Sequence, residues 1–294
     1  LLETAAIVLV GSLLLTAAIG LVKSWMDQDA IATNERRLDA IYTALSTYMG
    51  QYNKLPCPSS FTAAAGTAGF GRISTSCTGA TVLGTTSVTG RTGSTNAAGG
   101  AVLAGTIIVG ALPVRELGLP DSYIGNTYGY KYTYALTRSE ATAPLNPFAG
   151  AINVVDGTNA VVADLPRASD NLNTGAAMYV VVDHGKDGKG AHSSGTALVA
   201  PSSTCTGTGL DKLNCSYNAG SVPAAATPFA FRSAPFSHNP NPLSLASWFD
   251  DSIIYNKIST SSGCQTIYSP NGLGVAAGPG GSAGYTKSVT DDVA

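Results

Sequence analysis

The feature that most constrains this chain is the almost uninterrupted apolar character of residues 1–22. The polar side chains in this stretch are Glu3, Thr4, Ser12 and Thr16. As an α-helix the stretch rises roughly 33 Å, and the apolar core of a bilayer is about 30 Å thick. The sequence therefore predicts a segment suited to lipid or to a tightly packed bundle of helices.

A secretory signal peptide is the first alternative for this stretch. Such a peptide has a basic region before its apolar part and a small-residue cleavage site after it. Neither is found here, and the helical pattern continues past the apolar part. We therefore favour a segment that is retained.

The continuation predicts an amphipathic second half of the same helix. Gly and Pro are absent from 21–49, and Gly50 is a natural stop. The run ERRLD (35–39) supplies a solvated face. A single helix of this extent would be about 75 Å long. An apolar stripe on it, suited to lying on a sheet, comprises Ile31, Leu38, Ile41, Leu45 and Tyr48.

Glu3 is the costly residue of the apolar half. A carboxylate inside a membrane costs about 2.5–3.5 kcal/mol on insertion scales, so it needs a partner or a purpose. One alternative places Glu3 at the membrane interface, where a charge costs little. The other gives it a function, which is the default for an ionisable group within a membrane.

The segment LLETAAIVLVGSLLLTAAIG (1–20) resembles the start of mature type IV pilins and pseudopilins. In that family the glutamate is the fifth residue. The resemblance therefore implies two further residues and a cleaved leader before Leu1. It also implies that Glu3 neutralises the N-terminal amine of a neighbouring subunit, since two buried opposite charges cost less together than either alone. The implied filament core comprises Leu1, Leu2, Ile7, Val8, Leu9, Val10, Leu13, Leu14, Leu15 and Ile19.

One departure from the family pattern concerns the apolar half of the helix. Many pilins have a proline late in this segment, where the helix loosens in the filament. This chain has none there, and Gly11 and Gly20 are its weak points.

The rest of the chain predicts a head rich in β-structure. Strands are expected at 106–114, 128–136, 151–156, 176–185 and 248–258, with Gly and Pro between them. In 128–136, four tyrosines alternate on one face. The predicted fold is α+β, with the long N-terminal helix packed on a mainly antiparallel sheet with loop-rich insertions. Its parts are the helix (1–50), the head (51–264) and a Gly-rich C-terminal extension (265–294).

Three strings of the head strengthen the resemblance. GALPVRELGLPD (110–121), followed by 128–136, resembles a proline turn and short helix that lead into a β-hairpin. YVVVDHGKDGKGA (179–191) resembles the family's strand ending in a His-Gly loop. WFDDSIIYNK (248–257) resembles its late aromatic-Asp-Asp strand.

Five cysteines bear on the compartment. The short-range neighbours Cys57 with Cys77, and Cys205 with Cys215, predict two disulfides and an oxidising environment. Cys264 is left over. The spacing of the cysteines and the presence of only three His argue against zinc.

The loop 183–190 is the most site-like string of the head. Asp183 and Asp187 offer oxygen ligands to a hard cation such as calcium, although a tight turn explains Asp and Gly equally well. Asp250 and Asp251 are adjacent, so on a strand they face opposite sides. No nucleophile elbow or activated cysteine is evident, and an enzyme is not expected.

The expected function is that of a structural subunit that polymerises through its N-terminal helix. Its expected partners are copies of itself, the inner membrane before assembly, a prepilin peptidase and the pilus assembly machinery, and its expected place is a cell-surface filament. A pseudopilin of a type II secretion system is the alternative. A membrane-anchored binding or catalytic domain is a third hypothesis. With a net charge of −2, nucleic acid is not an expected partner.

Overall fold

The computed structural model of the 294-residue chain describes a helix and most of one sheet. Within α1, side chains are described from Ile19 onward, with the exception of positions 21 and 24. The described residues are 2–73, 77, 86–89, 106–145, 152–158, 177–195, 212–215, 230–234, 249–258, 265–268, 274–277 and 285–288.

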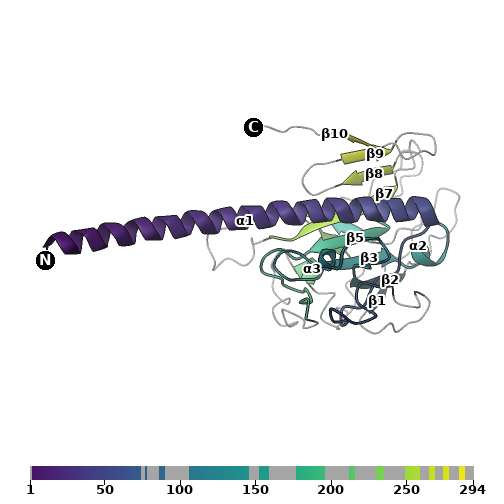
Figure 1. The fold of residues 1–294 in the computed structure, drawn as a ribbon. Helices are drawn as coiled ribbons and strands as arrows, with labels where there is room; N and C mark the ends of the chain where they lie inside the picture. Colours follow the sequence, from purple (N-terminus) through teal and green to yellow (C-terminus); the bar gives the residue numbers. More distant parts are fainter. Residues whose placement is uncertain are drawn as a thin grey trace.

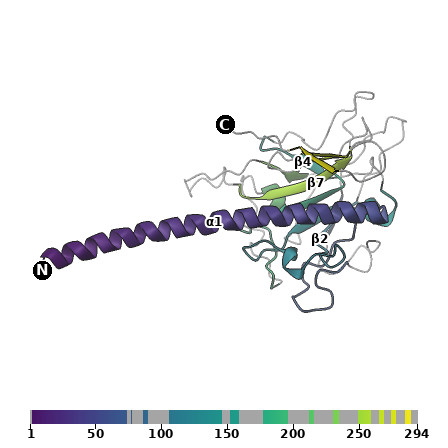
Figure 2. The same cartoon turned by 45° about the horizontal axis from the view of Figure 1, so that its top comes forward.

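The N-terminal helix, α1 (Leu2–Tyr52), confirms the predicted helix at this end of the chain. It ends two residues beyond Gly50, where Asn53 adopts a left-handed conformation (φ 49°) and its N–H donates to the carbonyl of Met49 at 2.9 Å. The C-terminal part of α1 lies across the sheet, and the N-terminal part extends beyond the head (Figures 1 and 2).

The main sheet has eight strands in the order β1-β2-β3-β5-β7-β8-β9-β10, and neighbouring strands are antiparallel. This confirms the predicted α+β class. The strands are β1 (Thr86–Thr89), β2 (Thr106–Ala111), β3 (Thr133–Thr137), β5 (Tyr179–Asp183), β7 (Ser252–Ile258), β8 (Gln265–Tyr268), β9 (Gly274–Ala277) and β10 (Tyr285–Ser288). The last three come from the expected C-terminal extension.

Smaller elements surround this sheet. Two strands pair in parallel, β4 (Asn153–Val155) with β6 (Ala230–Arg232). The short helices are η1 (Asp121–Ile124), α2 (Ser139–Thr142) and α3 (Lys212–Cys215).

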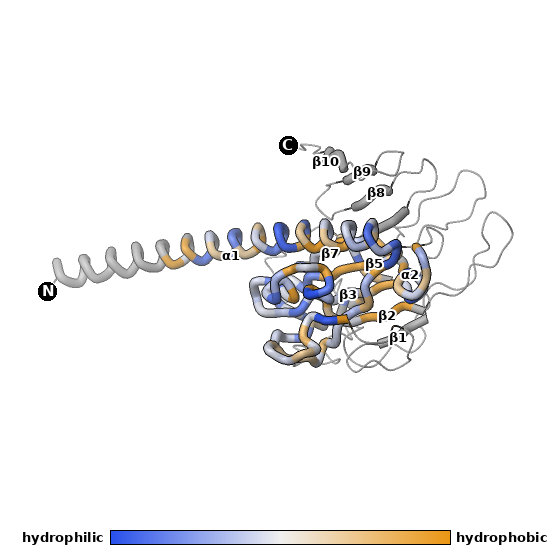
Figure 3. The backbone as a smooth tube through the Cα atoms, turned by 45° about the vertical axis from the view of Figure 1, so that its right-hand side comes forward, coloured by the Kyte–Doolittle hydropathy of each residue, from blue (hydrophilic) through white to orange (hydrophobic). Residues whose placement is uncertain are grey.

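The core lies where α1 meets the central strands. Leu38, Ile41 and Leu45 are at most 5% exposed, so the predicted stripe is buried at these positions. Strands β3 and β5 are buried at every residue, which fits the mostly apolar sequence of β5, while β3 also buries Thr133 and Thr137. Apolar residues accordingly dominate the middle of the sheet (Figure 3).

The prediction of one strand over 128–136 is wrong in its first half. Strand β3 begins at Thr133. Before it, 127–129 form a turn, and Tyr130 and Lys131 form isolated bridges. The side-chain oxygen of Asn126 accepts the N–H groups of Tyr128 and Tyr130, both at 3.0 Å, and Gly129 has a φ of 85°. These local bonds compete with strand pairing, so the four tyrosines do not share one strand.

Other expected strands are shorter than predicted. β2 ends at Ala111, two residues before Pro113, which cannot donate a ladder hydrogen bond. The strand expected at 151–156 is confirmed as β4, but it pairs with β6 outside the main sheet. β5 and β7 lie within the stretches predicted for them.

Candidate functional site

Four large apolar side chains are exposed in the part of α1 that extends beyond the head, with the exposed Lys23 among them. The exposed fractions are 61% for Ile19, 57% for Val22, 68% for Trp25 and 61% for Met26. On the same helix, the buried side chains begin at Asn34 and Leu38, where α1 reaches the sheet. The exposed apolar group Ile19, Val22, Trp25 and Met26, here called the apolar neck, is thus separate from the stripe that packs on the head.

Most of the side chains predicted to form a filament core lie outside the described residues. This holds for Glu3 and for Leu1, Leu2, Ile7, Val8, Leu9, Val10, Leu13, Leu14 and Leu15, whereas Ile19 is described and exposed. Over the described side chains, no helix combines the length and apolarity needed to cross a membrane.

Polar contacts fix α1 to the head just after the apolar neck. Asn34, 6% exposed, accepts the N–H of Thr127 at 2.8 Å. Arg37 donates to the carbonyl of Gly125 at 2.8 Å and lies 5.8 Å from the centre of the Tyr123 ring. Within the run 35–39, which was predicted to supply a solvated face, Arg37 is half-buried because it bonds to the turn before β3.

A salt bridge joins the same region of α1 to the loop after β5. The Lys186 ammonium lies 2.8 Å from each carboxylate oxygen of Asp27. Both side chains are partly exposed, and hydrogen bonding to Asp27 raises the pKa of Lys186. The two residues are 159 positions apart, so no local sequence pattern could have paired them.

Asp183 organises the loop after β5 from inside the protein. It is 3% exposed, and its Oδ1 accepts Asn126 Nδ2 at 2.6 Å and the N–H of Gly185 at 3.1 Å. Burial raises the pKa of Asp183 to about 6, against the lowering effect of these hydrogen bonds. Asn126 was not singled out from sequence, although an Asn ahead of Thr-Tyr-Gly is a usable turn signal.

Asp250, two residues before β7, holds the other side of this loop. Its Oδ2 accepts the N–H groups of Lys186 at 2.9 Å and Asp187 at 3.2 Å. Gly185 has a φ of 58°, and a Cβ there would lie 2.5 Å from the Asp250 side chain. A larger residue at this position would push the loop away from Asp250. This explains the glycine.

The two candidate calcium ligands have other partners. Asp183 accepts hydrogen bonds from Asn126 and Gly185. Asp187 accepts the N–H of Lys189 at 3.0 Å and forms an ion pair with the ammonium of Lys189. In the described part of the chain, no three His, Cys, Asp or Glu side chains group so that they could hold a metal ion. The calcium hypothesis therefore gains no support from this loop.

Asp250 and Asp251 have separate partners, in keeping with their predicted opposite directions. Asp251 Oδ2 accepts Asn214 Nδ2 at 2.9 Å, while Asp250 binds the loop after β5. Both carboxylates are buried, with exposed fractions of 5% and 4%. They hold separate segments against the start of β7 rather than acting on one site.

Two further buried titratable groups support the head. His184 Nε2 is 2.7 Å from Thr133 Oγ1, and burial lowers its pKa to about 3. Lys131 donates to the carbonyls of Phe61 and Ala63 at 2.7 and 2.8 Å, and burial lowers its pKa to about 8. Because these two bonds go to main-chain oxygens, Lys131 anchors the 61–63 segment.

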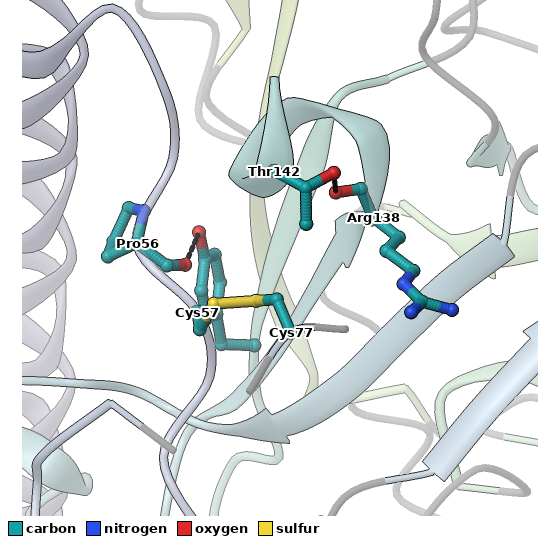
Figure 4. The surroundings of a disulfide bond; sticks show 6 residues. Pro56, Cys57, Cys77, Arg138 and Thr142 are labelled. Carbon is teal, nitrogen blue, oxygen red and sulfur yellow. Dashed lines mark hydrogen bonds between the residues drawn. A yellow bond between two sulfur atoms is a disulfide. The ribbon is translucent and has the colours of Figure 1, made fainter. Parts of the chain in front are cut away.

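The structure contains a disulfide between Cys57 and Cys77, the pair expected from the sequence, with a Cα–Cα distance of 5.9 Å. It lies beside Pro56, whose carbonyl accepts the Tyr134 hydroxyl at 3.1 Å (Figure 4). The disulfide therefore adjoins the end of α1. Cys205, Cys264 and the side chain of Cys215 lie outside the described residues.

Comparison with models of protein families, with curated proteins and with solved structures finds no match for this chain. Its function is therefore inferred from its own residues and geometry.

Proposed function

We propose that this chain is a type IV pilin-like structural subunit that polymerises through its N-terminal helix into a cell-surface filament, from a position in the inner membrane. The observation that carries the proposal is the apolar neck. Four large apolar side chains of α1 are 57–68% exposed, although the same helix buries a second apolar stripe against the head.

Exposed apolar area of this kind favours association. Burying one such side chain contributes about 1.5–3 kcal/mol. Contiguous apolar surface on a soluble chain commonly marks a protein or membrane contact. Further along α1, the head is held by polar contacts and the buried stripe, so the neck can engage a partner without unfolding the head.

The apolar sequence of 1–22 extends the same surface toward the N-terminus. In a parallel bundle of such helices, each neck contacts other necks, and the heads lie on the outside. Glu3 pairs with the N-terminal amine of a neighbouring subunit in this proposal, which offsets the cost of burying either charge. A prepilin peptidase and a pilus assembly machinery act on the chain before and during assembly.

Shearing of cells tests this function. Long fibres that contain the chain are expected in the sheared supernatant under the electron microscope. A chain confined to the inner-membrane fraction, without fibres, would instead favour a pseudopilin of a type II secretion system. A monodisperse membrane-bound chain that never forms fibres, even when overproduced, would refute both.

Replacement of Glu3 tests the charge pairing separately. Glu3→Ala subunits should reach the membrane in normal amounts and assemble poorly, because the neighbour's amine would lose its partner. Thr4→Ala is the matched control, since it changes the adjacent position without removing a charge, and it should assemble normally. Equal fibre yields from the two variants would contradict the pairing.

A further inference from the structure

The three methionines of the chain differ sharply in their exposure to solvent. Met49, near the end of α1, is 5% exposed, and Met178, just before β5, is 1% exposed. Met26 is 61% exposed and belongs to the apolar neck, one residue before the Asp27 that binds Lys186. Among the methionines, solvent therefore reaches the thioether of Met26 alone.

Met26 shares a row of apolar side chains with other residues of the neck (Figure 1). Ile19, Val22 and Met26 follow one another along α1 at spacings of three and four residues, which places their side chains on one face of the helix. Their exposed fractions lie between 57% and 61%. Lys23, also exposed, borders this row, and its long stem allows the ammonium to remain in solvent. A partner that packs on the row therefore buries the sulfur of Met26.

A thioether in this position is open to oxidation by a hydroperoxide. The sulfur attacks one oxygen of hydrogen peroxide, an S–O bond forms, and the O–O bond breaks. The hydroxide that leaves takes the proton from the transferred oxygen and becomes water. Sulfur loses two electrons and the peroxide gains them. The product, methionine sulfoxide, is polar and chiral where the thioether was apolar.

We propose that Met26 is an oxidation site, and that its sulfoxide weakens the association of the apolar neck with a second copy of this chain. The sulfoxide oxygen is a hydrogen-bond acceptor, whereas the row around it is apolar. Burying a polar group without a hydrogen-bond partner is unfavourable. The effect on association rests on the proposed assembly through the neck, while the selectivity for Met26 rests on its exposure.

Peptide mapping tests the selectivity. The full-length chain in detergent is treated with hydrogen peroxide, and the sulfoxide at each methionine is followed by mass spectrometry. In the folded chain, Met26 should be oxidised at least about tenfold faster than Met49 and Met178, because peroxide reaches buried sulfur only when the fold opens. In guanidinium chloride the three rates should be alike. Equal rates in the folded chain would overturn the oxidation site.

Sedimentation velocity of the same chain tests the effect on association. The oxidised wild type should associate about tenfold more weakly than its untreated sample, and reductases that act on both sulfoxide epimers should restore the association. Met26→Leu is the matched variant, since leucine is apolar, has a similar volume and takes up no oxygen. Measured against its own untreated sample, this variant should not respond to peroxide. An equal response of Met26→Leu would place the effect at another residue and overturn the proposal.

The two measurements separate this inference from the proposed function. If Met26 is oxidised selectively and association does not change, the inference is wrong and assembly through the neck stands. If the untreated wild type does not associate at any concentration, assembly through the neck is wrong, and the effect of oxidation on it is wrong as well. The peptide map decides the oxidation site in either case.

Discussion

Replacement of Asp183 by Asn should change how the stability of the head depends on pH. Asp183 is 3% exposed at the end of β5, and burial raises its pKa from 3.8 to about 6. Between these values the unfolded chain loses the proton while the folded chain retains it. The contribution of Asp183 to stability is therefore greatest below about pH 4 and is lost as the pH rises toward 6. A pKa difference of roughly 2 at 1.36 kcal/mol each corresponds to about 3 kcal/mol.

The groups that act on Asp183 define what the variant must preserve. Asn126 and the N–H of Gly185 donate to its Oδ1, Asp250 raises its pKa through charge repulsion, and Arg37 lowers it. Asn at this position keeps an oxygen acceptor and cannot titrate. The free energy of unfolding of the variant minus that of the wild type should therefore rise by about 3 kcal/mol between pH 4 and pH 7.5.

Urea denaturation of the full-length chain in detergent, followed by circular dichroism, measures this difference. Titrating groups that do not interact with Asp183 behave alike in both proteins, so their contributions cancel. Asp121→Asn is the control with the opposite sign. Asp121 is exposed, and its hydrogen bond with Arg115 lowers its pKa, so the same difference should fall slightly as pH rises. A difference for Asp183→Asn that is constant across this range would refute the reasoning.

Four other substitutions test the core and the loops. Leu45→Ala should lower the free energy of unfolding of the head, measured by urea denaturation, by about 3 kcal/mol, because Leu45 is fully buried. Ile31 is 37% exposed, so Ile31→Ala should lower it by less than about 1 kcal/mol. Burial gives His184 a pKa of about 3 in the folded chain, so wild-type stability should be lost as the pH falls below 6.5. In acid denaturation, His184→Gln should lack this pH-dependent loss, which corresponds to about 5 kcal/mol. Lys131→Met should speed chymotrypsin cleavage after Phe61, because the ammonium no longer holds that carbonyl; an unchanged cleavage rate would contradict the anchoring role.

The spacing of apolar residues predicted those parts of the fold in which a single helix or strand buries one face. Of the predicted stripe Ile31, Leu38, Ile41, Leu45 and Tyr48, the middle three side chains are buried, whereas Ile31 is 37% exposed and Tyr48 is half-buried. The apolar run around β5 predicted a central strand, and β5 pairs with β3 on one side and β7 on the other. In both cases an apolar face must be buried, so the order of apolar and polar residues along the helix or strand predicts it.

The spacing of apolar residues did not predict where local hydrogen bonds compete with long-range ones. Alternating tyrosines at 128–134 fit a strand, but the Asn126 side chain captures two backbone N–H groups and turns the chain first. Likewise, Arg37 reads as a solvated residue until Gly125 comes within reach. The candidate site was only partly predictable, because Asp183 was visible in its loop while its partners Asn126 and Asp250 come from distant segments.

The arrangement of contacts along α1 suggests how the helix keeps one position on the sheet. An apolar stripe is tolerant of sliding, since a shift of one turn, about 5.4 Å, brings another apolar residue over much the same surface. Directional bonds are not tolerant, because a hydrogen bond weakens steeply beyond its normal length and angle. The bonds from Asn34 and Arg37 to the turn at 125–127, and from Asp27 to Lys186, lie at the end of the stripe nearest the apolar neck. They therefore fix the register of α1 where a force on the neck would enter the head, while the buried stripe supplies most of the stability behind them.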